Sequence, residues 1–556
     1  MKKVRADTPF QSLILWSSAV FLILFVILPL GSLFIEAFHN SKDEFVGFKN
    51  FIDYFTTPNL MTSLSNTLYV STVTTVITVI LAFGYAYGLT RTYIYGKQFL
   101  KFSGMLPLFA PTMMLGISLI YLFGNKGLLT MLGVKVALYG QFGIIVSEVI
   151  YAFPQAFMIL LIALTYGDQR LYEVADVMGT SSIKKFMTIT LPGVKYGLIS
   201  ASFVAFTMSF TDFGAPKVVG GNYNVLATDI YKQVVGQQNF SMGSVVGILL
   251  MIPAVLSFVV DRLLKSKHRE TINAKTVALK IKFNPVRDIL FNIYCYVICF
   301  VIYGLLGTVL FAATANIWPY DLTFTLKYFF FDSPSTGGIS SYYNSLLVAT
   351  ITACIGTIVV FLIAYVIEKM RKLPKVRQGV YFLSILPLAL PGLVIGISYV
   401  FYFINPNNPF NFLYGSIWIL VIANIIHFYS VPFITATTSL RKLDKEFELV
   451  SESMRIPFLQ FFQKVTLPMS VPALLEIFFY FFVNSMVTIS AVVFLYAAEF
   501  KLAAIAIVNM EDAGDIASAA ALSVLIIGTN ILVRGLYEGL NYWIQKNQKV
   551  GKRLDE

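Results

Sequence analysis

The residues of this chain that could bind a solute or take part in chemistry are polar side chains inside long apolar runs. Glu148 and Asn424 each lie within such a run, at the same distance before a Leu-Pro pair, Leu191-Pro192 and Leu467-Pro468 respectively. Polar side chains inside membrane spans are costly, and they mark either transport pathways or hydrogen bonds between helices. The equivalent placement of these two residues therefore predicts a shared polar interface, which fits a solute pathway or an interhelical contact.

A second set of polar residues ends two later apolar runs at corresponding positions. The first run ends in Ser209, Thr211 and Asp212, and the second in Asn484, Ser485, Thr488 and Ser490. Gly214 and Pro216 follow the first set and are expected to break a helix, leaving backbone groups to face a cavity. A translocation path and a purely structural kink both fit this pattern.

No enzyme site is visible among the polar residues. The sequence pairs no nucleophile with a base, and the phosphate-binding pattern Gly-X4-Gly-Lys-Ser/Thr is absent. The three cysteines lie in apolar runs and the three histidines are scattered, which predicts neither a disulfide framework nor a metal site. We therefore expect a protein that is not an enzyme and binds no cofactor itself.

The composition indicates that most of this chain lies in lipid rather than in water. Hydrophobic residues make up 57%, charged residues 13%, and the mean hydropathy is +0.75. A soluble domain carries roughly 25% charged residues, and a membrane span needs about 20 apolar ones. The apolar runs reach that length repeatedly without the alternation of a β-barrel. The predicted class is an all-α polytopic membrane protein embedded in a lipid bilayer.

The apolar runs predict about twelve transmembrane helices. They lie near 12–37, 64–90, 99–123, 138–166, 194–213, 242–264, 287–313, 342–367, 379–403, 414–438, 471–496 and 516–541. Basic residues cluster in alternate loops, which the positive-inside rule places in the cytoplasm together with both termini. The net charge of +12 then needs no nucleic-acid partner, and the expected location is the bacterial cytoplasmic membrane.

The two halves of the chain repeat each other. Residues 106–118 return as residues 386–398, with the pattern Leu-Pro-Leu followed by Pro and then by Gly-Ile-Ser. We predict a first repeat at 1–264, a cytoplasmic linker at 265–286 and a second repeat at 287–556. Six spans per half make the repeats parallel, related by an axis along the membrane normal.

A polar loop in the first half carries a specific motif. Within residues 168–192, Glu173, Ala175 and Gly179 are followed after nine residues by Ile-Thr, then Leu191 and Pro192. This spacing is that of the EAA loop, and the chain resembles a fused pair of binding-protein-dependent ABC importer permeases with the type I fold. The corresponding loop at 444–468 is degenerate. It keeps Ser451, Leu467 and Pro468, but Leu449 replaces the Glu and Arg455 the Gly.

The resemblance implies the partners and the role of this loop. Its short coupling helix would dock in a groove of a separate ABC ATPase subunit, a homodimer that uses ATP and Mg, and a separate extracytoplasmic binding protein would capture the solute. Ala175 is small enough for close approach to the groove, Gly179 suits a break with positive φ, and Pro192 suits the start of the next helix. Because the second motif is degenerate, we expect the first loop to couple more tightly.

The resemblance also narrows the cargo. The stretch Asp212-Phe213-Gly214-X-Pro216 and residues 226–231 resemble the iron(III) and 2-aminoethylphosphonate permeases, and residues 487–496 resemble the phosphonate branch. The predicted cargo is therefore a phosphonate such as 2-aminoethylphosphonate, with iron(III), thiamine or a polyamine as alternatives. A secondary transporter with parallel repeats would share the span count, but it would not need an ATPase-docking loop.

Overall fold

A computed structural model gives the fold of residues 9–268, 279, 281, 283–330, 332–333, 336–370, 372–454 and 456–554. Two compact units divide the chain. Unit 1 combines Met1–Val46, Asp332–Ala506 and Leu525–Glu556, and unit 2 combines Gly47–Phe331 with Ile507–Val524. The predicted repeats divide the chain by sequence and the units divide it by packing, so the two divisions fall at different places.

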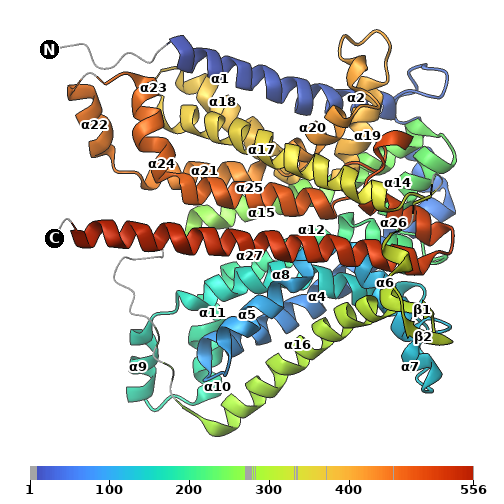
Figure 1. The fold of residues 1–556 in the computed structure, drawn as a ribbon, viewed down its shortest axis with the longest axis horizontal. Helices are drawn as coiled ribbons and strands as arrows, with labels where there is room; N and C mark the ends of the chain where they lie inside the picture. Colours follow the sequence, from blue (N-terminus) through green and yellow to red (C-terminus); the bar gives the residue numbers. More distant parts are fainter. Residues whose placement is uncertain are drawn as a thin grey trace. The chain divides into compact units, whose positions relative to one another are not determined.

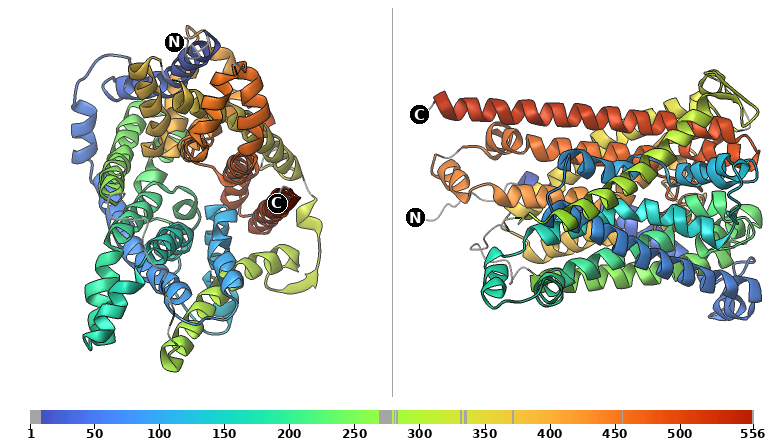
Figure 2. Two further views of the ribbon diagram at one scale, coloured as in Figure 1. Left: turned by 90° about the vertical axis from the view of Figure 1, so that its left-hand side faces the viewer. Right: turned by 90° about the horizontal axis from the view of Figure 1, so that it is seen from below.

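Unit 2 is built on three mutually packed helices, α4, α8 and α12. Its elements are α3 (Lys49–Thr56), α4 (Pro58–Arg91), α5 (Lys97–Met105), η2 (Leu106–Phe109), α6 (Thr112–Phe123), α7 (Leu128–Met131), α8 (Gln141–Thr165), α9 (Gln169–Val177), α10 (Ser182–Lys185), η3 (Phe186–Thr190), α11 (Leu191–Gly193), α12 (Lys195–Thr211), α13 (Gly214–Val219), α14 (Leu226–Tyr231), η4 (Lys232–Gly236), α15 (Phe240–His268), α16 (Pro285–Thr314), β1 (Ala315–Ile317), β2 (Asp321–Phe324) and η5 (Lys327–Phe329). The antiparallel hairpin of β1 and β2 lies at the opposite end of this unit from α9 (Figures 1 and 2).

Unit 1 is built on α17, which packs against α20, α21 and α25. Its elements are α1 (Pro9–Leu22), η1 (Ile23–Ile27), α2 (Leu28–Ala37), α17 (Ile339–Lys369), α18 (Pro374–Ile385), η6 (Leu386–Ala389), α19 (Gly392–Phe403), η7 (Asn411–Leu413), α20 (Ile417–His427), α21 (Ser430–Lys442), α22 (Lys445–Ser453), α23 (Phe458–Phe461), η8 (Phe462–Thr466), α24 (Leu467–Met469), α25 (Val471–Val487) and η9 (Ala498–Phe500). The helices α26 (Ala503–Asp512) and α27 (Ile516–Leu554) each contribute residues to both units.

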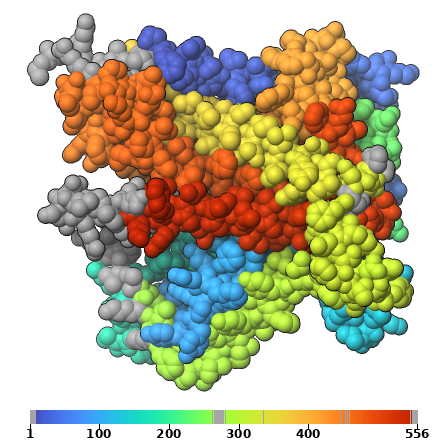
Figure 3. Space-filling view, viewed as in Figure 1, coloured from blue at the N-terminus to red at the C-terminus, as the bar shows by residue number. Residues whose placement is uncertain are grey.

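The first helix of each sequence repeat packs on helices of the other repeat. In unit 1, α1 contacts α17 and α18 while α2 contacts α19; in unit 2, α16 contacts α4, α5 and α6. The surface view shows α16 lying against the α5 segment (Figure 3). Such long apolar helices satisfy their own backbone groups in lipid, so side-chain packing selects the neighbours.

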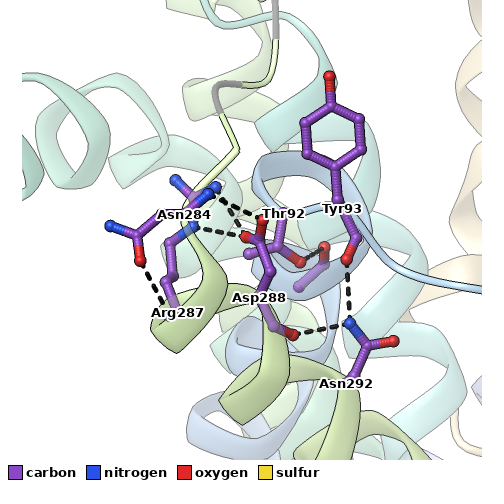
Figure 4. Close-up of polar contacts among 7 residues, drawn as sticks. Thr92, Tyr93, Asn284, Arg287, Asp288 and Asn292 are labelled. Atoms are coloured by element: carbon purple, nitrogen blue, oxygen red, sulfur yellow. Dashed lines mark hydrogen bonds and ion pairs between the residues drawn. The ribbon is translucent and has the colours of Figure 1, made fainter.

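Polar groups fix the start of α16 on the loop that follows α4 (Figure 4). The Asn292 amide donates to the Tyr93 carbonyl at 2.9 Å, and the Arg287 guanidinium donates to the Asp288 carboxylate at 2.7 Å. The Asn284 backbone N–H donates to the same carboxylate at 3.1 Å. Asn292 therefore holds α16 on this loop, while the contacts of Asp288 order the first turn of the helix itself.

The predicted all-α membrane class is confirmed. Among the described residues, eight helices are long and apolar enough to span a membrane, and there are up to twelve spans if each of four bent pairs counts as one. The repeated Leu-Pro-Leu motif forms the short turns η2 and η6, and the chain bends by 112° between Pro374–Ala389 and Gly392–Phe403. The predicted span 471–496 is wrong in its second part, because α25 ends at Val487 and turns follow.

Candidate functional site

The first polar loop folds as a helix, a break and a second short helix. The Asp168 carboxylate caps α9 by accepting from the Arg170 N–H at 3.1 Å, and Ser181 caps α10 through the Lys184 N–H at 3.4 Å. Gly179 lies between the two helices with φ +65°, a conformation that favours glycine. The expected helix and break are therefore confirmed, and α9 crosses the end of the long helices of its unit (Figure 1).

The second polar loop has the same outline despite its degenerate sequence. Asp444 takes the place of Asp168 when the two loops are aligned on their Leu-Pro pairs. Its carboxylate accepts from the Glu446 N–H at 3.0 Å at the start of α22. Arg455, which replaces the motif glycine, lies outside the described residues. α23 and η8 lead into Leu467 and Pro468, which begin α24.

Both Leu-Pro pairs mark the entry to a bent span. Leu191 and Pro192 begin α11, and the chain bends by 64° before α12. Leu467 and Pro468 begin α24, and the corresponding bend before α25 is 71°. Proline in a first helical turn needs no internal hydrogen-bond partner, so the pair suits these abrupt helix starts.

The outward faces of the two loops share four exposed apolar positions in this alignment, although the exposed Val177 corresponds to Ser453. Met178 is 76% exposed, and its counterpart Met454 is 68% exposed. Three further exposed apolar pairs occupy equivalent positions, namely Leu171 with Phe447, Val174 with Val450, and Ile183 with Leu459. An exposed apolar cluster marks an interaction surface. The motif search missed these residues, although their apolar character in a polar loop was a readable signal.

The motif residues themselves face inward or pair locally. Ala175 and Ser451 are both buried, and the expected approach of Ala175 to a partner groove stays a prediction. Glu173 accepts a hydrogen bond from the Gln169 amide at 3.0 Å. In the second loop its counterpart, Leu449, is exposed.

Each loop is anchored by a cation from the end of the second long helix of its repeat. Arg91, at the end of α4, donates to the Leu164 carbonyl at 2.8 Å, and its guanidinium carbon lies 5.6 Å from the centre of the Tyr172 ring. Lys369, at the end of α17, forms an ion pair with Glu448. Glu448 occupies the position of Tyr172 in the aligned loops, so it serves as an anchor rather than as a displaced motif glutamate.

In the membrane part of unit 2, the predicted residues Glu148 and Asp212 lie together with Thr112, which was not predicted. Glu148 on α8 is fully buried and faces the carboxyl group of Asp212, which directly follows α12. Asp212 accepts from the Ala215 N–H at 2.9 Å and from the Thr112 hydroxyl. No N–H or hydroxyl group donates to Glu148, whose polar partner is the Asp212 carboxyl group.

The other predicted pathway residues of unit 2 lie on α12. The Thr211 hydroxyl donates to the Thr207 carbonyl at 2.9 Å, while Ser209 is buried and its hydroxyl has no hydrogen-bond partner. Thr211 therefore satisfies itself along the helix, and Ser209 is the residue with unused hydrogen-bonding capacity.

Unit 1 holds the counterpart of this polar site without its charges. Asn424 on α20 is buried with neither amide atom paired, and the Ser485 hydroxyl is likewise buried and unpaired. Asn484 donates along α25 to the Tyr480 carbonyl at 2.7 Å, and Thr488 ends that helix in a buried position. Sequence reasoning missed His427, although that side chain lies at the same contact as Ser490.

One close contact between a glycine and a hydroxyl group occurs in both repeats, but the glycine and the hydroxyl residue exchange positions. A Cβ atom at Gly214 would lie 2.0 Å from the Thr112 hydroxyl oxygen, and one at Gly392 would lie 2.2 Å from the Ser490 hydroxyl oxygen. Thr112 corresponds to Gly392 in the repeat, and Gly214 to Ser490. Each repeat thus places one hydroxyl in this contact and requires a glycine opposite it.

No group of three or more His, Cys, Asp or Glu side chains is placed to hold a metal ion within the described part of the chain. The arrangement offers paired carboxyl groups, hydroxyl groups and amides at corresponding positions of two repeats.

Comparison with known proteins identifies this architecture. Residues 80–270 and 361–546 match the family model described as binding-protein-dependent transport system inner membrane component. The ferric transport system permease protein FbpB of Actinobacillus pleuropneumoniae is 26% identical over 92% of this chain and 76% of its own length. A putative ferric transport system permease protein FbpB 1 of Haemophilus influenzae is 26% identical over 86% and 77%.

Further similarities cover less than half of the chain. The spermidine/putrescine transport system permease protein PotC homolog of Mycoplasma pneumoniae is 27% identical over 38% of this chain and 73% of its own length. A crystal structure of a bacterial ABC transporter involved in alginate import matches 48% of this chain and 96% of its own at 18% identity, with a TM-score of 0.39.

Proposed function

Because the chain belongs to the family of binding-protein-dependent transport system inner membrane components, and is a fused ABC importer permease, we propose that its cargo is iron(III). The observation that carries this proposal is the similarity to ferric permeases across most of the chain. The relatives favour the iron alternative over the phosphonate predicted from residues 487–496.

The chemistry of the membrane site supports the same choice. Glu148 and Asp212 present two carboxyl groups to each other. Two carboxyl groups in a poorly solvated site disfavour an anion such as a phosphonate, and their oxygen atoms suit a hard cation. The second repeat adds neutral groups at Asn424 and Ser485, which repel neither an anionic nor a cationic solute.

Energy for transport comes, in this proposal, from a separate ATPase with two grooves. The exposed apolar faces around Met178 and Met454 are the surfaces that would enter those grooves and lose contact with water. A homodimeric ATPase fits two faces of matching composition. ATP and Mg would be bound by that partner.

The same exposed surfaces indicate which side of the membrane holds the two termini. In unit 1, α22 lies at the end where α1 begins and α27 ends (Figure 1). An ATPase at α22 is cytoplasmic, so both termini would be cytoplasmic as well, in agreement with the basic loops. A separate binding protein would deliver the solute to the opposite face.

Uptake by the reconstituted complex tests this function. The full chain is placed in proteoliposomes with its ATPase, and iron(III) or 2-aminoethylphosphonate is supplied on the cognate binding protein. We expect iron accumulation that requires both ATP and the binding protein. Accumulation of the phosphonate without iron would overturn the cargo, and proton-driven uptake by the chain alone would indicate a secondary transporter.

A further inference from the structure

We infer that α4 and α17 each transmit movement between a polar loop and a segment of the translocation path. The positioning residues at the path end are Asn66 and Thr67 on α4, and Asn344 and Ser345 on α17. Their side chains bond the segments that lead into α14 and α26, and each segment lies at the end of its unit opposite to α9 or α22 (Figure 1). This role rests on the permease function proposed above, but it does not depend on the identity of the cargo.

The Thr67 hydroxyl links α4 to the first residue of α14. It donates to the Ser63 carbonyl at 2.7 Å and accepts from the Leu226 N–H at 2.8 Å. The N–H groups of a first helical turn have no acceptor within their own helix, and Leu226 begins α14. Thr67 and Leu226 are both buried, so water does not replace this bond. Asn66 adds a second bond, from its amide to the Asn224 carbonyl at 2.9 Å.

The second repeat makes the same contacts with a different hydroxyl residue. The Ser345 hydroxyl accepts from the N–H of Ala503, the first residue of α26, at 2.7 Å. The Asn344 amide donates to the carbonyl groups of Glu499 at 3.1 Å and Lys501 at 3.2 Å. The residues joined through the hydroxyl are 158 positions apart here and 159 in the first repeat. Equivalent positions of the chain therefore meet in each unit.

The segments held in this way carry polar residues of the predicted path. Residues 212–225 link α12 to α14 and include Asp212, and residues 488–502 link α25 to α26 and include Ser490. Each segment also has a close contact near its start, at Gly214 in the first repeat and at Ser490 in the second. Each segment is therefore fixed near both ends, and release at the end beside α14 or α26 would displace the polar residues.

The contacts are kept in both repeats although the segments that they hold have diverged. α14 has six residues and α26 has ten. With the halves aligned on their Leu-Pro pairs, Asp212 corresponds to the uncharged Thr488. Retention of the amide and the hydroxyl beside such changes fits a role in placing each segment relative to α4 or α17.

The same two helices contact the polar loops at their other ends. Arg91, the last residue of α4, lies against the ring of Tyr172, and Lys369, the last residue of α17, forms an ion pair with Glu448. α4 is continuous over 34 residues, which corresponds to about 50 Å. A rigid helix with specific contacts at both ends can carry a displacement from one site to the other. Movement of a polar loop by the ATPase would thus reach the path segment.

Removal of the hydroxyl groups tests this role in the reconstituted complex. Thr67→Val and Ser345→Ala each leave a buried N–H without its acceptor, and each should lower the solute taken up per ATP hydrolysed severalfold. Thr67→Ser and Ser345→Thr retain the hydroxyl and should restore that ratio. The matched controls are Thr72→Val and Thr350→Val, five positions further along each helix, where an exposed hydroxyl donates to a carbonyl of its own helix. Unchanged uptake per ATP in Thr67→Val and Ser345→Ala, or equal losses in the controls, would overturn the role.

Hydrogen exchange separates this role from the choice of cargo. In the purified chain, Thr67→Val should speed exchange of residues 212–226 about tenfold, since one buried hydrogen bond is lost. ATP and Mg added to the complex of chain and ATPase, without solute, should change this exchange in the parent and much less in Thr67→Val. An equal response to ATP in both chains would overturn the transmission. A parent that accumulates no iron(III) would contradict the proposed cargo, while the exchange measurement would still decide the role of Thr67.

Discussion

The two coupling loops differ in sequence motif but agree in outward surface. The first carries Glu173, Ala175 and Gly179, whereas the second has Leu449, Ser451 and Arg455. Four of their exposed apolar positions nevertheless correspond, whereas Val177 and Leu449 have the polar counterparts Ser453 and Glu173. Ala175 of the motif is buried and packs on its own unit, whereas the exposed apolar residues of both loops lie outward.

This difference changes the expectation of unequal coupling. Where the structure describes both loops, the outward faces offer a partner similar apolar surface, and the inward anchors differ. Arg91 contacts a tyrosine ring and a carbonyl, while Lys369 contacts a carboxylate. Any inequality between the loops would then arise from how firmly each is held.

The largest effect is expected from a charge placed on the outward faces. Met178→Glu and Met454→Glu should each weaken ATPase association by about 2 kcal/mol or more, roughly thirtyfold, because an unpaired charge would enter an apolar contact. Pull-down of the ATPase and ATP-dependent uptake measure this loss. Thr188→Ala, an exposed change outside the apolar set, is the control. A loss confined to Met178→Glu would restore the unequal model.

The reciprocal glycine contact offers a sharper comparison of the repeats. Gly214→Ser should destabilise the chain by about 1–3 kcal/mol, because the new side chain meets the Thr112 hydroxyl and overpacks the contact. Adding Thr112→Gly recreates the arrangement of Gly392 and Ser490 and should recover most of the loss. Thermal unfolding of the full chain measures both effects. No recovery in the double variant would show that the two contacts are not equivalent.

The anchors should respond differently to salt. Lys369→Met should loosen α22 by about 1 kcal/mol or less, and the loss should shrink at high ionic strength, which screens a partly exposed ion pair. Arg91→Met should loosen α9 by about 1–2 kcal/mol with little salt dependence, because Arg91 is buried and loses a ring contact and a hydrogen bond. Hydrogen exchange of α9 and α22 reports both values. Equal salt dependence would contradict the assigned anchors.

Features that depend on a short stretch of sequence could be predicted from the sequence. Apolar runs predicted the spans, and Gly179 predicted a break, because span length and positive φ depend on short stretches of sequence. The exchange of α1 and α16 between repeats escaped prediction, since an apolar run does not encode which neighbour it packs against. The same limit hid the pairing of Lys369 with Glu448, residues 79 positions apart that only the fold brings together.

An ion pair outside the membrane spans also breaks the two-fold relation. Lys217 contacts Asp512 at 2.7 Å, and its ammonium lies 5.7 Å from the centre of the Tyr231 ring. With the halves aligned on their Leu-Pro pairs, Lys217 corresponds to Val493 and Asp512 to Gly236, and these residues cannot form such a pair. Asp512 of the second half therefore forms an ion pair in unit 2 that has no counterpart at the equivalent positions Val493 and Gly236.

A further small effect is predicted for Glu511, which lies beside this pair. Burial raises the pKa of Glu511 to about 7, the neighbouring Asp512 adds to the rise and Lys217 opposes it. The unfolded chain releases this proton near pH 4.5, so the folded state loses its advantage as the pH rises from about 4.5 to 7. Solvent screening at this partly buried group limits the loss to about 1 kcal/mol. Glu511→Gln should flatten thermal stability over this window, and a parallel decline in the variant would assign the pH dependence to another group.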